Sequence, residues 1–182
     1  MRRLHLLNAT LLALLVAGSL WTWSDLPAQI PVHFDWTGAA DRYAEATLLQ
    51  WLLLPLLALA VAGTLYASAW WIERRVEGLN VPNQEAFDAL SAPEQRQVAA
   101  LPLRYLYGLT TGVLLLFGGL QAATYHMAVQ GRDTMPAYHS VATGAFLVGT
   151  LAATVWLVVA MQRRVNRLAQ DNGPSSAGKK EA

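Results

Sequence analysis

Four long apolar stretches, separated by polar segments, dominate the hydrophobic pattern of this chain. The stretches 4–23, 48–72, 105–130 and 135–162 contain no Asp, Glu, Lys or Arg. Each is at least as long as the roughly 20 residues that a helix needs to cross the hydrocarbon core of a bilayer. Because a chain in lipid must satisfy its own backbone hydrogen bonds, such stretches are expected to be helical. The pattern predicts an all-α polytopic membrane protein with four transmembrane helices, at 4–23, 48–72, 104–129 and 137–162.

The polar segments between these helices divide the chain into four parts. We expect a first domain over 1–72 with an extended loop at 24–47, an amphipathic connector at 73–103, a helical hairpin at 104–167, and a disordered tail at 168–182. In the connector, Asn83 can cap one short helix, and the Ser91 to Glu94 segment reads as the capping box of another. A solvated connector without helices is the alternative.

The distribution of charge predicts the orientation. Hydrophobic residues make up 54% of the chain and charged residues 14%, with a formal net charge of +1. Eleven of the thirteen basic residues lie before the first helix, between 74 and 104, or after the fourth helix, and only Arg42 and Arg132 lie in the other two loops. By the positive-inside bias, both termini are cytoplasmic and the loop 24–47 is extracytoplasmic. Nothing in this distribution indicates a nucleic-acid partner.

The N-terminal segment has a second interpretation. The basic residues Arg2 and Arg3, followed by an apolar run through Ala17-Gly18-Ser19, resemble a secretory signal peptide. The apolar run continues to Trp23, which is long enough to span a bilayer and favours a first transmembrane helix. Cleavage would leave three spans and an external N-terminus.

The loop 24–47 shows an alternating pattern. Pro27 and Pro31 push the residues before them out of the helical region, so the chain is extended here. In an extended chain Ile30, Val32, Phe34 and Trp36 would lie on one face, while His33 and Asp35 would lie on the other. We expect the His33 ring to bond the loop backbone or Asp35, and Gly38 to supply a turn where positive φ is needed.

The same loop resembles a known family. The pattern Leu-Pro-x-x-Ile-Pro-x-His-Phe, then Gly, then Asp-x-Tyr, set between two spans, is similar to the bacterial membrane domain of unknown function that forms the N-terminal half of SdpI-type toxin-immunity proteins. A lysine that usually follows the tyrosine in that family is replaced here by Ala44-Glu45-Ala46. The matching residues are Pro27, Ile30, Pro31, His33, Phe34, Gly38, Asp41 and Tyr43.

Three histidines are expected at the outer face: His33 in the loop, His126 near the end of the third helix, and His139 near the start of the fourth. Neutral imidazoles with nearby carboxylates are suitable ligands for zinc and similar ions. One hypothesis is therefore a metal or cation site at the outer face. The alternative, which we favour, is that each histidine is an interfacial residue beside an aromatic, as in Tyr125-His126 and Tyr138-His139.

Chemistry within the membrane has little support in the sequence. There is no nucleophile-elbow or histidine-glutamate zinc motif, the chain has no cysteine, and none of the spans carries a charge at mid-depth that could mark an ion pathway. Uncharged polar residues could line a narrow polar path or, as we favour, bond across helices or back to their own backbone. They are Asn8, Thr64, Ser68, Thr110, Thr111, Gln121, Thr143 and Thr150.

These observations lead to an expected function without catalysis and without a required cofactor. The resemblance implies a binding or protective, immunity-like role at the bacterial cytoplasmic membrane. The outer loop would be the recognition surface for a peptide toxin, a lipid or another membrane protein. Two alternatives remain open: a small transporter or cation sensor that uses the outer histidines, and a subunit of a larger membrane complex.

Overall fold

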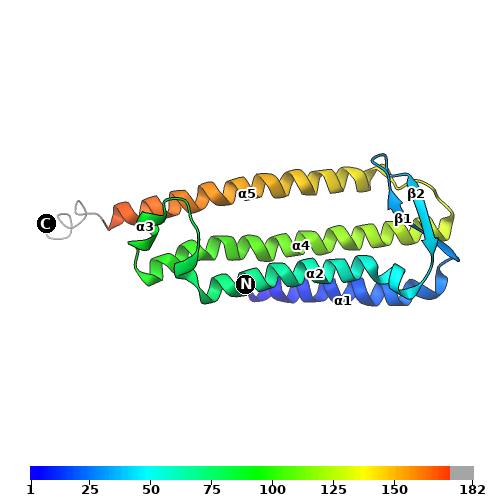
Figure 1. Ribbon diagram of the computed structural model, residues 1–182, viewed down its shortest axis with the longest axis horizontal. Coiled ribbons are helices and arrows are strands. Elements are labelled where there is room, and N and C mark those ends of the chain that lie inside the picture. Colours follow the sequence, from blue (N-terminus) through cyan, green and yellow to red (C-terminus); the bar gives the residue numbers. More distant parts are fainter. Residues whose placement is uncertain (173–182) are drawn as a thin grey trace. The chain divides into compact units, whose positions relative to one another are not determined.

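The computed structural model describes residues 1–172, which form five α-helices and one two-stranded antiparallel sheet (Figure 1). Four helices are long and apolar enough to cross a membrane, which confirms the predicted number of such helices. The two-stranded sheet departs from the all-α prediction. The elements in chain order are α1 (Arg2–Thr22), β1 (Gln29–Phe34), β2 (Ala40–Glu45), α2 (Leu48–Arg74), α3 (Gln84–Asp88), α4 (Ala92–Gln130) and α5 (Ala137–Asp171).

The chain divides into two compact units. The first unit consists of Met1–Leu65 and Tyr107–Gly149, and the second consists of Tyr66–Leu106 and the chain from Thr150 onward. The sheet and the loop that joins α4 to α5 both belong to the first unit. The helix α3 belongs to the second unit.

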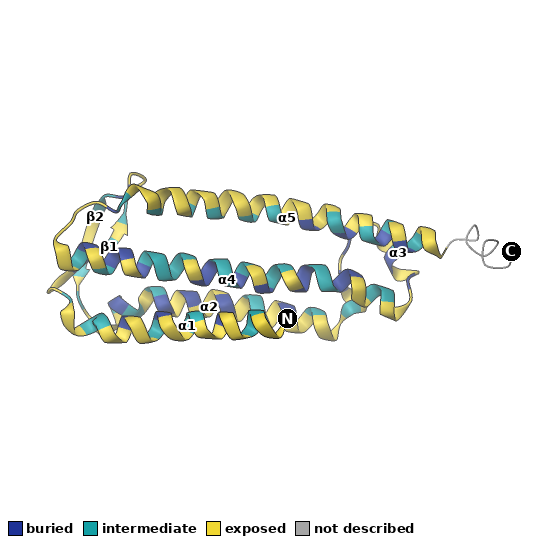
Figure 2. Ribbon diagram, turned by 180° about the vertical axis from the view of Figure 1, so that it is seen from behind, coloured by how far each residue is buried: buried dark blue, intermediate teal, exposed yellow. Residues whose placement is uncertain are grey.

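In the first unit, small and polar side chains form much of the helix packing. Ala58 and Ala62 of α2 pack with Leu15 of α1 and Leu114 of α4. The large apolar side chains point outward instead: Leu14 and Leu147, for example, are more than half exposed, and α5 is exposed along most of this part (Figure 2). This arrangement suits a helix bundle in lipid, where small residues let backbones approach and large apolar ones face the acyl chains.

Polar side chains join the helices of the first unit, as the sequence led us to favour. Asn8 is 3% exposed. Its amide donates to the Tyr107 carbonyl at 3.1 Å, and its oxygen accepts from the Thr111 hydroxyl at 2.6 Å. Thr64, by contrast, donates back to the carbonyl of Ala60 in its own helix. The Asn8 bonds fix α1 against α4.

A proline inside α2 creates a second polar contact between helices. Pro55 has no N–H, so the carbonyl of Trp51, four residues earlier, lacks its helical donor. The side-chain amide of Gln121 in α4 donates to this carbonyl at 3.2 Å, and the Trp51 indole N–H donates to the Ser19 carbonyl in α1 at 2.7 Å. The backbone defect that the proline causes in α2 is therefore repaired from α4.

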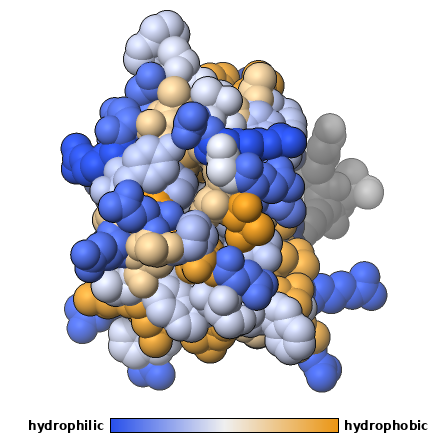
Figure 3. Space-filling model, turned by 90° about the vertical axis from the view of Figure 1, so that its right-hand side faces the viewer, coloured by the Kyte–Doolittle hydropathy of each residue, from blue (hydrophilic) through white to orange (hydrophobic). Residues whose placement is uncertain are grey.

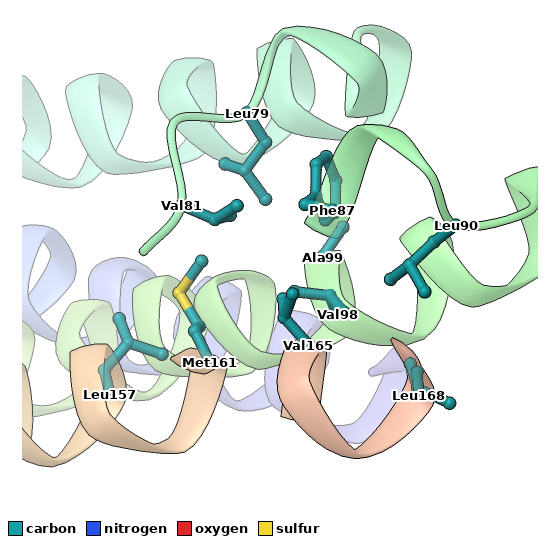
Figure 4. Packing of buried hydrophobic residues seen from close by; sticks show 10 residues of the cluster. All are labelled: Leu79, Val81, Phe87, Leu90, Val98, Ala99, Leu157, Met161, Val165 and Leu168. Carbon is teal, nitrogen blue, oxygen red and sulfur yellow. The ribbon is translucent and has the colours of Figure 1, made fainter. Parts of the chain in front are cut away.

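The second unit has a larger apolar core (Figure 4). Phe87 of α3, Val98 of α4 and Val165 of α5 are all fully buried. Asn83 accepts from the Ala86 amide and begins α3, and the Ser91 amide and hydroxyl both donate to Glu94 at the start of α4. The predicted cap at Asn83 is therefore present, and of the predicted capping box the structure shows the bond from the Ser91 amide to Glu94. The whole core cluster comprises Leu79, Val81, Phe87, Leu90, Val98, Ala99, Leu157, Met161, Val165 and Leu168.

We predicted that the connector ends at 103 and that a separate helix begins at 104. The structure has one continuous helix there, α4. Pro102 lies inside it without ending it. A proline in a helix interior costs about 3 kcal/mol or more, but burial of Val98 and Ala99 against the core offsets that cost. The apolar face of the connector therefore packs against the last part of α5 and does not lie free as an amphipathic surface.

The fourth long helix also extends further than the predicted span. The helix α5 continues past 162 to Asp171, because Val165 and Leu168 lie buried in the core of the second unit. Residues 168–171, predicted as the start of a disordered tail, are therefore helical. The remainder of the predicted tail, 173–182 with Lys179 and Lys180, lies outside the described residues.

The loop predicted to be extended at 24–47 forms the hairpin of β1 and β2. Pro27 follows a 3₁₀ turn over Trp23–Asp25, and Leu26 before it is extended, as a residue before proline should be. The pairing runs from Gln29 opposite Glu45 to Phe34 opposite Ala40, with two irregularities around His33. These irregularities break the simple alternation predicted from the sequence, since a bulge shifts the side chains that follow it.

Candidate functional site

The tip of the hairpin is held by Asp35. Its carboxylate accepts from the Thr37 amide at 2.8 Å, the Thr37 hydroxyl at 2.6 Å and the Ala39 amide at 2.9 Å. These bonds favour the charged form, so the pKa of Asp35 is lowered, with the Thr37 hydroxyl as the largest cause and the Ala39 amide next. An aspartate that bonds the backbone in this way fixes a turn.

Gly38 completes the turn for two reasons. Its φ is +85°, a conformation that residues with a side chain rarely adopt. A Cβ at this position would also lie 3.3 Å from the Ser140 Oγ and 3.4 Å from the Met135 Cβ. The prediction of a positive φ at Gly38 is therefore confirmed. The close approach of the chain after α4 is an additional constraint that the sequence did not reveal.

The loop between α4 and α5 pairs with the hairpin. The Met135 amide donates to the Gly38 carbonyl, and the Ala40 amide donates to the Asp133 carbonyl, both at 2.7 Å. The Tyr43 hydroxyl donates to the Asp133 carboxylate at 2.9 Å. That bond, and then burial, raises the pKa of Tyr43 above its ordinary value. The two loops of the first unit therefore form a single platform, which we call the hairpin platform (29–45 with 131–136).

His33 and Asp41 pair across the hairpin. The His33 Nδ1 lies 2.6 Å from the Asp41 Oδ1, and both side chains are about half exposed. Asp35, which we expected as one of two possible partners of His33, instead accepts the hydrogen bonds at the tip of the turn. Because water screens exposed pairs, the His33–Asp41 contact adds little stability. It does orient the imidazole on the outer surface of the platform.

The underside of the hairpin is apolar. Ile30 is 2% exposed, and Phe34 packs against Met127 of α4 and Met135 of the loop. A cavity of about 230 Å³ lies beneath the strands, lined among others by Ile30, Pro31 and Phe34. The motif residues Ile30, Pro31 and Phe34 thus seat the hairpin on the helices.

Trp36 does not follow this pattern. We predicted it on the apolar face with Ile30 and Phe34, but it is 92% exposed at the tip of the hairpin. The bulges in the strands and the turn at Asp35 carry it away from that face. Seen from the hairpin side, hydrophilic side chains surround smaller apolar areas (Figure 3).

The structure does not bring the three outer histidines together. His33 pairs with Asp41, His126 lies against Tyr125 with ring centroids 5.6 Å apart, and His139 lies against Tyr138 at 4.3 Å. Within residues 1–172, no group of three His, Asp or Glu side chains could hold a metal ion. The metal hypothesis therefore gains no support from the geometry, while the aromatic neighbours predicted for His126 and His139 are present.

Three contributors to the site were missed or only partly recognised. Asp133 and Met135 lie in a short loop with no recognisable motif, so only tertiary pairing reveals their role. Gln121 was noted as a polar residue in an apolar run, but its partner could not be assigned. The sequence did contain an indication of this bond, because a proline inside a helix, such as Pro55, leaves the carbonyl four residues earlier without a donor.

These features define the class of the molecule. Four apolar helices make the chain a multi-pass membrane protein. The segment 10–59, which runs from α1 through the hairpin into α2, matches a family described as a domain of unknown function (DUF1648). No curated protein and no solved structure matches the chain.

Proposed function

We propose that this chain is a non-enzymatic binding protein of the bacterial cytoplasmic membrane, with a protective, immunity-like role against a membrane-active peptide. In this proposal both termini are cytoplasmic, and the hairpin platform is the extracytoplasmic recognition surface. The observation that carries it is Trp36, a large aromatic side chain that is 92% exposed on a turn held by hydrogen bonds.

The rigidity of the platform supports a role in recognition. The tip is fixed by Asp35 from within and by Met135 and Asp133 from the neighbouring loop. A fixed turn presents a side chain without the entropic cost of ordering it on binding. Tryptophan is also among the residues most enriched at energetically dominant positions in interfaces. The platform therefore has the properties expected of a binding surface that presents one exposed aromatic side chain, Trp36, on a rigid turn.

The charge pattern supports the orientation. Among the described loops, the platform side carries only Arg42 and Arg132, whereas 73–104 carries four arginines. The chain lacks cysteine, so a single introduced cysteine shows on which side of the membrane its position lies. An impermeant thiol reagent should label Arg42→Cys in intact cells and Glu85→Cys only after the cells are opened. The reverse result would place the platform in the cytoplasm and overturn the proposal.

The recognition step has its own test. Cells that express the chain should survive a membrane-active peptide better than cells that lack it, and Trp36→Ala should remove this protection. Loss of a dominant interface tryptophan costs about 2 kcal/mol or more, which corresponds to roughly 30-fold weaker binding. The matched control is Trp21→Ala, since Trp21 is 83% exposed but lies on α1. Equal survival of all strains across a panel of such peptides would contradict the proposal.

A further inference from the structure

A second cavity lies between α1 and α4, within the part of the first unit that crosses the membrane. Its volume is about 370 Å³, which is within the range of roughly 300–1,000 Å³ that is common for small-molecule sites. Leu11 and Leu15 of α1 and Leu114 of α4 line it, and Gly118 and Gly119 leave room where side chains would otherwise stand. A Cβ built on Gly118 would meet nothing within 4 Å.

One residue that lines this cavity has a polar side-chain atom without a partner. Gln121 lines both this cavity and the one beneath the hairpin. It is 6% exposed, and its Oε1 is buried without a hydrogen bond. Within residues 1–172 it is the one buried side-chain nitrogen or oxygen in that state. Rotating the Gln121 amide by 180° would not give every group a partner. The Trp51 carbonyl needs the Gln121 N–H as its donor, because Pro55 has no N–H to offer. The orientation of the amide therefore leaves an unpaired acceptor on a residue that lines the cavity.

An unpaired hydrogen-bond acceptor within a membrane favours ligands that carry a donor over ligands that do not. A buried carbonyl oxygen without a donor is unfavourable, and ordinary acyl chains have no donor to offer it. Acyl chains also gain little by moving from the bilayer into an apolar cavity, since lipid is already as apolar as leucine. A molecule with an apolar chain and a hydrogen-bond donor would gain a bond that its non-donating analogue lacks.

The cavity has a polar end that fits such a molecule. Thr22 of α1 and Tyr125 of α4 line it together with the leucines. Tyr125 lies one helical turn beyond Gln121 along α4, and its hydroxyl donates to the Asp25 carboxylate at 3.1 Å. The lining therefore changes from leucine to hydroxyl-bearing side chains along α1 and α4, with Gln121 next to the change.

We propose that this cavity binds the chain of a membrane amphiphile that carries a hydroxyl group, and that this hydroxyl donates to the Oε1 of Gln121. The site is distinct from the surface of the hairpin platform, and the proposal does not depend on the protective role suggested above.

The test compares two photoreactive probes on the purified full chain in phosphatidylcholine nanodiscs. One probe is a long-chain alcohol with a mid-chain diazirine, and the other is its methyl ether, which lacks the donor. Hydrogen bonds within membranes are worth about 0.6–2 kcal/mol, so the alcohol should label the α1 and α4 peptides roughly three- to thirty-fold more strongly at limiting probe concentration. Equal labelling by the two probes would overturn the proposal.

Variants locate the site. Gly118→Phe should fill the cavity and abolish labelling by both probes, whereas Gly144→Phe should leave labelling unchanged, because Gly144 is an equally unobstructed helical glycine outside the cavity. Gln121→Leu, made in a Pro55→Ala background that restores the missing N–H to α2, should reduce the alcohol-to-ether ratio to about one. Persistence of the preference in that variant would show that the acceptor is not Gln121 and would also overturn the proposal.

Discussion

The two units of this chain exclude water from their interiors in different ways. The second unit buries ten apolar residues in one cluster, with Phe87, Val98 and Val165 fully covered. In the first unit the clusters are small, and all five buried polar side chains of residues 1–172 lie there: Asn8, Ser19, Thr110, Gln121 and Thr124. The same helices α2, α4 and α5 contribute to both units.

The difference matches two known modes of helix packing, one typical of water and the other of lipid. In water, apolar burial is the main favourable term in folding. Between helices in lipid that term is largely absent, so close packing of small residues and hydrogen bonds must take its place. The charges Glu94, Arg96, Arg163 and Arg164 lie on helices of the second unit, whereas the α-helical parts of the first unit after Arg3 carry none. One helix can therefore follow two packing rules along its length.

The largest effect is expected when a mutation creates a cavity in the core of the second unit. Phe87→Ala should cost about 3–5 kcal/mol, because a large side chain is removed from a closed apolar core. Hydrogen exchange should show lost protection in α3 and the start of α4, while the hairpin amides remain protected. Glu85→Ala, an exposed change on the same helix, should stay within about 0.5 kcal/mol. Equal loss of protection in the hairpin would mean that the two units unfold as one.

The next effect concerns the two glycines with positive φ. Alanine in this conformation costs about 1–2 kcal/mol, and both Gly38 and Gly131 have it. A Cβ at Gly131 meets nothing within 4 Å, whereas one at Gly38 approaches Ser140 and Met135. Gly38→Ala should therefore cost about 1 kcal/mol or more beyond Gly131→Ala. Faster hydrogen exchange of the Ala40 and Met135 amides in Gly38→Ala would reveal this additional loss of stability. Equal costs would show that the loop does not constrain the turn.

A smaller effect should appear at the proline in α2. Gln121→Leu leaves the Trp51 carbonyl without a donor and should cost about 1–3 kcal/mol. In a Pro55→Ala background the restored backbone N–H should reduce that cost. A double-mutant cycle, measured by reversible unfolding in mixed micelles, gives the coupling between the two positions. If Gln121→Leu costs the same in both backgrounds, the side chain does not repair the helix.

The smallest effect is a dependence on pH in the hairpin platform. The pKa of Tyr43 is raised by its bond to Asp133, so the contribution of this bond is complete below the ordinary tyrosine pKa of about 10. It is lost as the pH rises through the higher pKa of the folded state. Asp133→Asn should return that pKa toward the ordinary value. The difference in phenolate absorbance between the chain and Tyr43→Phe measures it, and an unchanged titration would contradict the assignment.

The helices and caps could be predicted from local sequence, and the boundaries could not. Asn83 and the Ser91–Glu94 pair marked helix starts correctly because a cap involves residues only three positions apart. Pro102 and the residues after 162 misled the prediction, because the helix there is stabilised by a core assembled from distant segments. Propensity is a weak prior that such packing overrides.

The candidate site divides in the same way. The turn at Gly38 was predicted because its geometry follows from the residue itself. For His33 we expected the loop backbone or Asp35 as the partner, whereas its ring pairs with Asp41, which neighbours the residue opposite His33 in the folded hairpin. The exposure of Trp36 was also missed, because a bulge shifts the face of every residue after it and leaves no mark in the alternating pattern.

The sequence by itself determined that this chain has four long apolar helices, because a backbone in lipid has few other ways to satisfy its hydrogen bonds. The choice of partners depended on the tertiary structure. Only there do Gln121 and the Trp51 carbonyl meet, and only there do Met135 and Asp133 reach the hairpin. The physical reason is range: apolar length is a property of one segment, whereas a hydrogen bond between helices requires two segments to arrive at the same place.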